Sequence, residues 1–435
     1  MTSRYSKAVY VVDGSRTPFL KLKGKPGPFS ASDLAFWAGR TLLERQSFQP
    51  GDLDEVILGC VIPGPEEANI ARVVALRLGC GHSVPAWTVQ RNCASGMQAL
   101  DSAARSISSG RCHLVLAGGT EAMSHAPLLF NRDLVHWFAE WQMKKDWKSR
   151  VQNLSRLRPK HLKPVIALLK GLTDHNVGLS MGQTAEILAH RFEISREEMD
   201  SYALQSHCRL NNAVESGNMK EVETIYDQNG NYYDRDDGLR LDSDMKKLGK
   251  LKPVFDRGMG KVTAGNSAQV TDGAAMLILA SKEAVKKYKL PLMGKIVGCH
   301  WAGVDPSQMG LGPAHAVPPL LAENKLNLDQ IDFWEINEAF AAQVLACLKA
   351  WKDPDYCKNE LRLDKAFGEI DPNKLNIDGG GISLGHPVGA SGARITLHLL
   401  HVLKRKGAKR GVATLCVGGG QGGAMLVERE QQKGK

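Results

Sequence analysis

Short apolar runs alternate with helical stretches along most of the chain. The first half contains, in order, LDEVILGC, NCASGMQALDSAARSI and HLVLAGGTEAM. The second half contains LDQIDFWEIN, GHPVGASGARITLHLL and GVATLCVGGGQGGAM in the same order. Each set predicts a strand, a turn of small residues that opens a helix, and a second strand that ends in glycines. Strands that alternate with helices indicate the α/β class, in which helices cover the sheets.

The two sets can be aligned, and the alignment shows where the halves differ. CASG in the first half corresponds to GASG in the second, so Cys93 is matched by Gly389, and Leu116 is matched by Cys416. Two similar halves are expected to pack around a pseudo-twofold axis, where their matching loops meet. The repeat would therefore bring Cys93 of the first half close to His386 and Cys416 of the second half.

A segment of different character separates the halves. Within it, residues 131–170 contain ten Lys or Arg and three Asp or Glu, a net charge of +7 out of +10 for the whole chain. Apolar residues recur at helical spacing from Leu134 to Trp141 and again from Trp147 to Leu154, but the stripe shifts between them, so one continuous helix is not expected. The segment fits a solvated helix hairpin at an oligomer interface as well as it fits contact with a membrane or a partner protein.

The length of the chain, 435 residues, suggests two or three domains. We predict an N-terminal half at 1–121 completed by about 255–282, a loop domain at 122–254 with a basic, Trp-rich insertion at about 131–170, and a C-terminal half at 283–435.

Composition excludes several classes of protein. Hydrophobic residues make up 43% and charged residues 23% of the chain, no apolar run is long enough to span a membrane, and the N-terminus has no secretory pattern. The nine cysteines are scattered without a C-x-x-C pair or a nearby histidine at ligand spacing. We therefore expect a cytoplasmic protein in a reducing compartment, with neither a disulfide framework nor a metal site.

Cys93 stands just before an expected helix. The unpaired N–H groups and the dipole at a helix N-terminus favour an anion, so they would lower the pKa of a thiol at this position. Taken alone, a buried structural cysteine is the commoner explanation for such a residue.

His386 lies in the glycine-rich stretch GISLGHPVGASG. A residue before proline adopts an extended or turn conformation, and the glycines predict a tight loop that opens a helix. A histidine there can act as a base or a hydrogen-bond donor, or it can simply bond to the backbone of the turn.

The stretch CVGGGQGG, which begins at Cys416, contains the spacing G-x-G-x-x-G. Only twelve residues follow its last glycine, Gly423, too few for the helix and strand of a dinucleotide-binding unit, so a nicotinamide site is not expected. Glycines after a strand can instead offer N–H groups to an oxyanion, and Cys416 could transfer a proton. Asn337, after another expected strand, fits a helix cap or a side chain that fixes a water or a carbonyl oxygen.

Five motifs occur in an order that resembles the thiolase family: NCASGMQA, GNSAQVTDGAA, NEAFAAQ, GHPVGASG and CVGGGQGG. The resemblance covers nearly the whole chain. It implies a thiolase fold, in which two similar halves form a five-layered αβαβα sandwich with an inserted loop domain. It also implies an acyl-CoA:acetyl-CoA C-acyltransferase of fatty-acid β-oxidation that works through an acyl-cysteine. Such an enzyme has no permanently bound cofactor and uses coenzyme A as co-substrate.

The resemblance assigns roles to residues that match its motifs. Cys93 resembles the nucleophile, and His386 resembles the residue that activates it and helps to hold the thioester oxygen. Asn337 resembles the residue that holds a water in that oxyanion hole, and Cys416 resembles the second acid/base. The backbone N–H groups of Cys93 and Gly418 would form the second oxyanion hole. The pantetheine and acyl pocket is matched by Met181, Phe255, Ala264, Ser267, Met309, Ala339 and Phe340.

Two positions depart from the family pattern. Ser180 stands where short-chain biosynthetic members often have histidine, and Ala268 stands where members often have serine. Both argue against strict specificity for acetoacetyl-CoA. An acetyl-CoA acetyltransferase remains an alternative. A ketoacyl-ACP synthase is less compatible, because it has a histidine where Asn337 stands and lacks Cys416. A non-catalytic lipid-binding subunit that docks on a membrane is a third alternative.

The resemblance also bears on partners. The basic insertion at 131–170 is similar to that of thiolase subunits in trifunctional β-oxidation complexes, where it is associated with the membrane or the partner subunit. The expected partners are acyl-CoA and CoA, a second or further copies in a homodimer or homotetramer, a hydratase–dehydrogenase α subunit, and a membrane surface. Nucleic acid is not expected.

Overall fold

The computed structural model describes residues 4–430. Its main sheet runs in the order β14-β15-β16-β13-β1-β12-β5-β3-β4, with β2 beside β12. The strands are β1 (Arg4–Arg16), β2 (Leu20–Lys21), β3 (Glu55–Gly59), β4 (Ala86–Val89), β5 (Leu114–Ala122), β12 (Thr271–Ala280), β13 (Gly294–Gly303), β14 (Phe333–Ile336), β15 (Arg410–Val417) and β16 (Gln421–Glu428).

The two halves of this sheet have the same topology. In the first half β3 and β5 are parallel, β12 is antiparallel to β5, and β1 is antiparallel to β12. In the second half β14 and β15 are parallel, and β16 and then β13 follow with antiparallel pairing. The equivalent strands β1 and β13 pair antiparallel and join the halves, as a pseudo-twofold axis between them requires. The repeat predicted from the sequence is therefore present.

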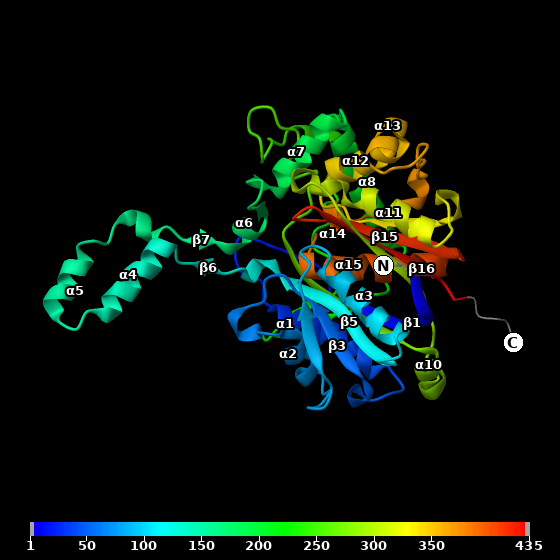
Figure 1. Cartoon of the computed structure of the whole chain (residues 1–435), viewed down its shortest axis with the longest axis horizontal. Coiled ribbons are helices and arrows are strands. Elements are labelled where there is room, and N and C mark those ends of the chain that lie inside the picture. Colours follow the sequence, from blue (N-terminus) through cyan, green and yellow to red (C-terminus); the bar gives the residue numbers. More distant parts are fainter. Residues whose placement is uncertain (1–3, 431–435) are drawn as a thin grey trace.

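Helices complete five layers (Figure 1). Helices α3 (Ser95–Ser108) and α15 (Val388–Lys406) form the central layer, and their apolar faces share one core with strands of both halves. Outside the first half lie α1 (Ala31–Glu44), α2 (Ile70–Arg77) and α10 (Lys282–Tyr288). Outside the second half lie α11 (Gly312–Glu323), α12 (Ala341–Lys352) and α13 (Pro354–Asn359). The order is αβαβα, so the fold class expected from the family resemblance is confirmed.

Local sequence explains where these elements begin and end. Helix α1 starts at a capping box in which Ser30 and Asp33 exchange hydrogen bonds. Helix α15 starts after Pro387 and ends at Gly407, whose φ of 64° suits glycine. Strand β12 reads TDGAAMLILA without alternation because all ten of its residues are buried between two helical layers.

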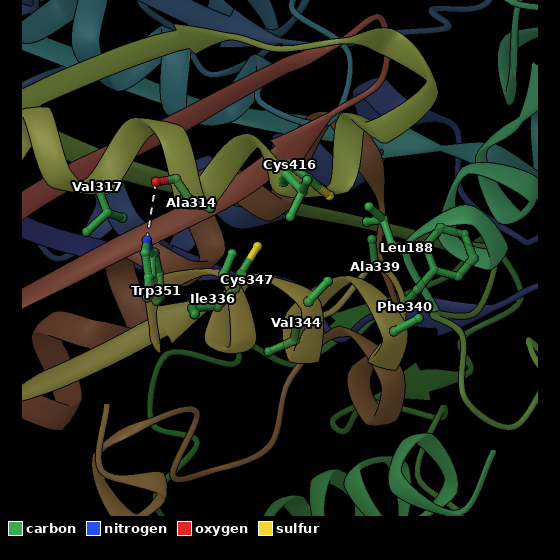
Figure 2. Close-up of a cluster of buried hydrophobic side chains, with 14 of the residues drawn as sticks. Leu188, Ala314, Val317, Ile336, Ala339, Phe340, Val344, Cys347, Trp351 and Cys416 are labelled. Carbon is green, nitrogen blue, oxygen red and sulfur yellow. Dashed lines mark hydrogen bonds between the residues drawn. The ribbon is translucent and has the colours of Figure 1, made fainter. Parts of the chain in front are cut away.

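The outer layer of the second half is tightly packed around Trp351 (Figure 2). The indole N–H of Trp351 donates to the carbonyl oxygen of Ala314 at 3.2 Å, which satisfies the one polar atom of this buried side chain. The same cluster reaches Phe340 and Cys416, so the core of this half extends to the loops that carry the candidate site.

The loop domain lies between the halves in sequence. Helices α7 and α8 pack on the outer core of the second half. The elements are β6 (Leu128–Leu129), α4 (Arg132–Met143), α5 (Trp147–Leu154), β7 (Val165–Ile166), α6 (Ala167–Gly171), β8 (Thr173–Asp174), β9 (Leu179–Ser180), α7 (Met181–Arg191), α8 (Arg196–Glu215), β10 (Ile225–Tyr226), β11 (Tyr232–Tyr233) and α9 (Met245–Gly249). A short helix of the second half, α14 (Gly381–Leu384), precedes His386.

The basic insertion forms two helices, α4 and α5, that project away from the body on the β6–β7 stalk (Figure 1). Trp137 and Trp141 stack with ring centroids 5.4 Å apart, and the Trp137 indole donates to the carbonyl of Asn153 at 2.9 Å. Trp147 and Val151, on the second apolar stripe, are instead 70% and 57% exposed. Among residues 4–430, no helix is long and apolar enough to cross a bilayer.

Candidate active site

Cys93 lies in the turn between β4 and α3, one residue before the N-cap of the helix. Asn92, the residue before it, has the left-handed conformation with φ of 43°, which asparagine tolerates better than most residues. The amide of Asn92 donates from Nδ2 to the carbonyl oxygen of Gly418 at 2.7 Å. The loop that carries Cys93 in the first half is therefore tied directly to the β15–β16 turn of the second half.

The expected lowering of the Cys93 pKa is wrong for this state of the protein. Burial raises the pKa of the Cys93 thiol, although the backbone N–H of Gly418 works in the opposite direction. The first N–H groups of the helix do not supply the missing stabilisation, because those of Ala94 and Ser95 donate to the carbonyls of Arg91 and Asn92. Cys93 is a thiol here, and it needs a base to become a nucleophile.

His386, which lines the same cavity as Cys93, is the candidate for that base. Its Nδ1 lies 2.6 Å from Ser391 Oγ, and the Ser391 hydroxyl donates to the carbonyl oxygen of Pro387 at 2.9 Å. A hydroxyl has one proton, so Ser391 must accept the Nδ1 proton, and the lone pair of the ring is left on Nε2. Burial lowers the pKa of His386 to about 4, with a smaller contribution from Arg394, so the imidazole is neutral at pH 7.

Asn337 follows β14 and lies beside His386. Its Nδ2 is 3.4 Å from both ring nitrogens of His386. The side chain does not cap a helix, since α12 begins four residues later at Ala341 and has Phe340 as its N-cap. Asn337 Oδ1 is buried, and no group in residues 4–430 donates to it. A buried amide oxygen in this position is suited to hold a small polar molecule.

Cys416 is the second thiol of the site. It lies near the end of β15, next to the turn formed by Gly418, Gly419 and Gly420. Burial raises the pKa of Cys416 well above its ordinary value, and the nearby Cys93 raises it further, so Cys416 is protonated in the free protein. The glycine run is the turn of an antiparallel hairpin and is followed by β16, which confirms that it does not open a dinucleotide-binding helix.

Two cavities meet at Cys93. The inner cavity has a volume of about 410 Å³ and is lined by Cys93, His386 and Cys416 together with mainly apolar side chains. The outer cavity, of about 380 Å³, shares Cys93 and also touches Gly418. Of the pocket residues expected from the family resemblance, those that line the inner cavity are Met181, Phe255, Ser267, Met309, Ala339 and Phe340.

Ala264 is the exception among the expected pocket residues. It is exposed and lines neither cavity, whereas Ser267, three residues later, lines the inner cavity. Ser180 and Ala268, the two departures from the family pattern, both line the inner cavity.

Matches to known families agree with this geometry. A family model described as "Thiolase, N-terminal domain" matches residues 9–283, and one described as "Thiolase, C-terminal domain" matches residues 290–429. The chain belongs to the thiolase family. The first match ends within α10, and the second begins two residues after that helix ends.

Several relatives within the thiolase family span the whole chain. The mitochondrial 3-ketoacyl-CoA thiolase of Bos taurus is 38% identical over 430 residues, 97% of this chain and 98% of the relative. The crystal structure of human mitochondrial 3-ketoacyl-CoA thiolase in complex with CoA superposes with a TM-score of 0.83 at 36% identity, covering 99% of this chain and 100% of that one. The structure of Bacillus anthracis acetyl-CoA acetyltransferase gives a TM-score of 0.83 at 37% identity, covering 98% and 100%.

The structure adds residues that sequence reasoning missed in this thiolase. Leu172 and Thr173, just after α6, line both cavities, although nothing in the sequence marks the end of the insertion as part of a site. Ser391 fixes the ring of His386, and its position in the first turn of α15, the helix that begins just after the histidine, is the signal that could have indicated it. Glu121 is fully buried between the halves and accepts three backbone N–H groups.

No group of three or more Asp, Glu, His or Cys side chains in residues 4–430 is arranged to hold a metal ion. The nucleophilic and basic side chains that line the inner cavity are two thiols and an imidazole. This set can form and stabilise a thioester and an oxyanion.

Proposed function

We propose that the chain catalyses thiolytic cleavage of a 3-ketoacyl-CoA by CoA, giving acetyl-CoA and an acyl-CoA shortened by two carbons. The reaction is a reversible Claisen condensation and passes through an acyl-Cys93 intermediate. The observation that carries the proposal is that Cys93 from the first half and His386 and Cys416 from the second line one apolar cavity. The family's retained thiols and imidazole thus come together from opposite halves.

In the first step His386 takes the proton of the Cys93 thiol through Nε2, and the sulfur attacks the keto carbon of the substrate. The oxyanion that forms needs hydrogen-bond donors, and we assign this role to the backbone N–H groups of Cys93 and Gly418, which also stabilise a Cys93 thiolate. Removing one such donor commonly costs about 10²–10³ in rate. The bond between Cα and Cβ then breaks, leaving the acyl group on Cys93 and an enolate of acetyl-CoA.

In the second step Cys416 donates its proton to the enolate carbon, and acetyl-CoA leaves. The enolate oxygen is held by the Nε2–H of His386 and by a water on Asn337, whose unpaired buried Oδ1 supports that role. CoA then enters as co-substrate and its thiol is deprotonated by Cys416. The CoA thiolate attacks acyl-Cys93 and releases the shortened acyl-CoA, so the kinetics should be ping-pong.

Acylation of Cys93 tests this proposal directly. Wild-type protein incubated with radiolabelled acyl-CoA should retain label after denaturation, whereas Cys93→Ala should retain none. Cys112→Ala is the matched control, because Cys112 is buried in the first half and lines neither cavity. Label on the Cys93→Ala protein would contradict the assignment of the nucleophile.

We favour substrates longer than acetoacetyl-CoA over a strict acetyl-CoA acetyltransferase. The inner cavity is mainly apolar and Ser180 replaces the histidine of many short-chain members. Comparison of kcat/KM for acetoacetyl-CoA and for a 3-keto-C12- to C16-acyl-CoA distinguishes the two activities. Higher kcat/KM for acetoacetyl-CoA would favour the short-chain enzyme. Activity on either substrate would exclude a non-catalytic lipid-binding subunit.

We further propose a cytoplasmic role in fatty-acid β-oxidation, with assembly through the edge of the sheet. Strand β4 is the last strand of the first half, and its four residues, Ala86–Val89, are only half-buried. An open edge of this kind is suited to pair with a second copy in a homodimer or homotetramer. Sedimentation equilibrium of wild type and of Trp87→Lys should show dissociation in the variant.

The projecting hairpin at 131–170 is proposed as the contact for a membrane or a hydratase–dehydrogenase α subunit. Its net charge is +7, and Phe130, Met143 and Trp147 are 65–81% exposed. This combination favours an anionic lipid surface. Flotation with phosphatidylserine vesicles at low salt should carry wild-type protein but not the variant in which Trp147 and Met143 are replaced by Ser. Absence of wild-type protein from the floating fraction would leave the α subunit as the partner to test by co-purification.

A further inference from the structure

Glu121, near the end of β5, is a buried carboxylate at the centre of the interface between the halves. Its Oε2 accepts hydrogen bonds from the backbone N–H groups of Val61 at 2.9 Å and Gly389 at 3.0 Å. Its Oε1 accepts from the N–H of Ile62 at 2.9 Å, and the Cys60 thiol lies 3.7 Å away. Burial raises the pKa of Glu121 to about 7, although these N–H donors stabilise the anion.

In the repeat, this carboxylate lies beside the residue that corresponds to the candidate nucleophile. Gly389 is the counterpart of Cys93, and its N–H is the second of α15, a helix of 19 residues. A carboxylate is favourable at the N-terminus of such a helix. A Cβ at Gly389 would lie 2.3 Å from the carbonyl oxygen of Thr120 and 2.7 Å from Glu121 Oε2. The Thr120 carbonyl and the Glu121 carboxylate together occupy the space that a second thiol would need.

The candidate base lies just before the same helical turn. His386 lies three residues before Gly389, and Ser391, which accepts the Nδ1 proton of His386, lies two residues after it. On the other side of Glu121, Val61 and Ile62 line the outer cavity. One carboxylate thus joins a wall of the outer cavity in the first half to the turn that orients His386 in the second half.

We propose that Glu121 is a positioning residue for His386. Through the N–H of Gly389 it fixes the first turn of α15, and with that turn the direction in which His386 Nε2 faces Cys93. It also closes the pseudo-equivalent site, so that only one of the two dyad-related positions is open to substrate. This inference rests on the proposed function, in which His386 is the base, and Glu121 itself touches neither cavity.

A double-mutant cycle tests the inference. In the full-length protein, Glu121→Gln should lower kcat/KM for thiolysis by about 10- to 100-fold, because small misplacements of a reacting group have effects of this size. In a His386→Asn background the same substitution should lower it by less than about twofold, because residues that act as one unit are not additive. Equal losses in the two backgrounds would overturn the inference.

Glu67→Gln is the matched control. Glu67 is also a buried carboxylate that accepts two backbone N–H groups, from Ser32 at 2.7 Å and Gly64 at 2.9 Å, but all these partners lie in the first half. The kcat/KM of the Glu67→Gln protein should stay within about twofold of that of wild type, even if its thermal midpoint falls. A fall as large as that of Glu121→Gln would assign the effect to loss of any buried carboxylate and overturn the inference.

A second variant covers the case in which Glu121→Gln does not fold, and the activity of His386→Asn separates failure of the proposed function from failure of the role of Glu121. If Glu121→Gln does not fold, Glu121→Asp keeps the charge but withdraws it by one methylene from Gly389, and the same cycle is run with this variant. If His386→Asn retains full activity, the proposed function fails. If His386→Asn is impaired and the cycle is additive, the role of Glu121 alone fails.

Discussion

The N-termini of the two central helices occupy equivalent positions in the repeat but have different surroundings. Cys93, at the N-terminus of α3, lines two cavities. Gly389, at the N-terminus of α15, lines neither and instead donates its N–H to the buried Glu121 carboxylate. The strands around them have the same order and direction. Duplication therefore supplies a common framework, and a few substitutions decide at which of the two positions chemistry takes place.

The largest effect should come from the second position at which the halves differ. Cys416 in the second half corresponds to Leu116, which has no proton to give. Cys416→Ser should lower condensation and α-proton exchange by about 10²–10⁴-fold, because a hydroxyl is a much weaker acid than a thiol at this position. Acylation of Cys93 by acyl-CoA should survive in part. The two rates are measured by deuterium exchange of acetyl-CoA and by label retained on the protein.

Cys347→Ser is the control for this prediction. Cys347 belongs to the same buried cluster (Figure 2) and donates to the carbonyl of Gly310 at 3.2 Å, a bond that a serine can keep. Its exchange rate should be unchanged. If Cys416→Ser loses acylation as completely as exchange, Cys416 is not the acid/base for the enolate.

Much of this comparison could be predicted from the sequence. The repeat and the small-residue turns predicted the pseudo-twofold axis, and the same alignment predicted that Cys93, His386 and Cys416 would come together. The repeat and its turns can be predicted because turns, glycine positions and helix N-termini depend on local sequence. The pairing of β1 with β13, which joins the halves, depends on contacts nearly 300 residues apart and has no local signal.

Other features depended on burial, which the sequence does not show. The helix N-terminus predicted a lowered pKa for Cys93, but burial of the sulfur raises it. Ala264 matched a family motif but faces solvent. Glu121 lies in an apolar strand, VLAGGTEA, and nothing in the sequence indicates that its partners are three backbone groups from distant loops.

A second prediction uses the buried cluster around His398 on α15. His398 on α15 corresponds to the half-buried Ser102 on α3. His398 Nδ1 lies 2.8 Å from Glu221 and its Nε2 lies 3.1 Å from Asp378, all deeply buried. Burial alone would lower the pKa of His398, but the two carboxylates raise it to about 10. Arg405 shares the Asp378 carboxylate.

The sign of the pH dependence follows from this shift. An unfolded histidine titrates near pH 6.5, so the stabilisation is complete below that pH and is lost as the pH rises through about 10. Loss of one charge from a buried pair costs about 3–5 kcal/mol. Urea unfolding of wild type should show a fall of that order between pH 7 and pH 10, and His398→Gln should show a much smaller one. An equal fall in both proteins would contradict the role of His398.

A third prediction concerns the close approach of the two central helices. A Cβ at Gly392 would lie 2.5 Å from the backbone nitrogen of Met97, and one at Gly96 would lie 2.8 Å from the carbonyl oxygen of Gly389. Gly392→Ala should lower the free energy of unfolding by about 1–3 kcal/mol, the usual cost of overpacking. Gly303→Ala is the control, because nothing lies within 4 Å of a Cβ there. A neutral Gly392→Ala would show that the helices can separate without cost.

The smallest effect is expected from the hairpin of α4 and α5, which has no counterpart in the second half. The contacts of the hairpin are largely internal: Asn131 Nδ2 bonds to the carbonyls of Lys160, His161 and Lys163. Its base is closed by pairing of Leu128–Leu129 with Val165–Ile166. Replacing residues 131–163 by a short glycine-containing turn should therefore leave the body intact.

We expect the shortened protein to keep kcat/KM for acetoacetyl-CoA within about twofold, and its thermal midpoint within about 2 °C, a shift that corresponds to about 2 kcal/mol for a chain of this size. Leu172→Ala, only nine residues beyond the replaced segment, is the contrasting variant, because Leu172 lines both cavities and should raise KM. If the shortened protein loses activity as Leu172→Ala does, the hairpin helps to shape the cavity walls. If only vesicle binding is lost, catalysis does not require the hairpin, and the hairpin acts in docking.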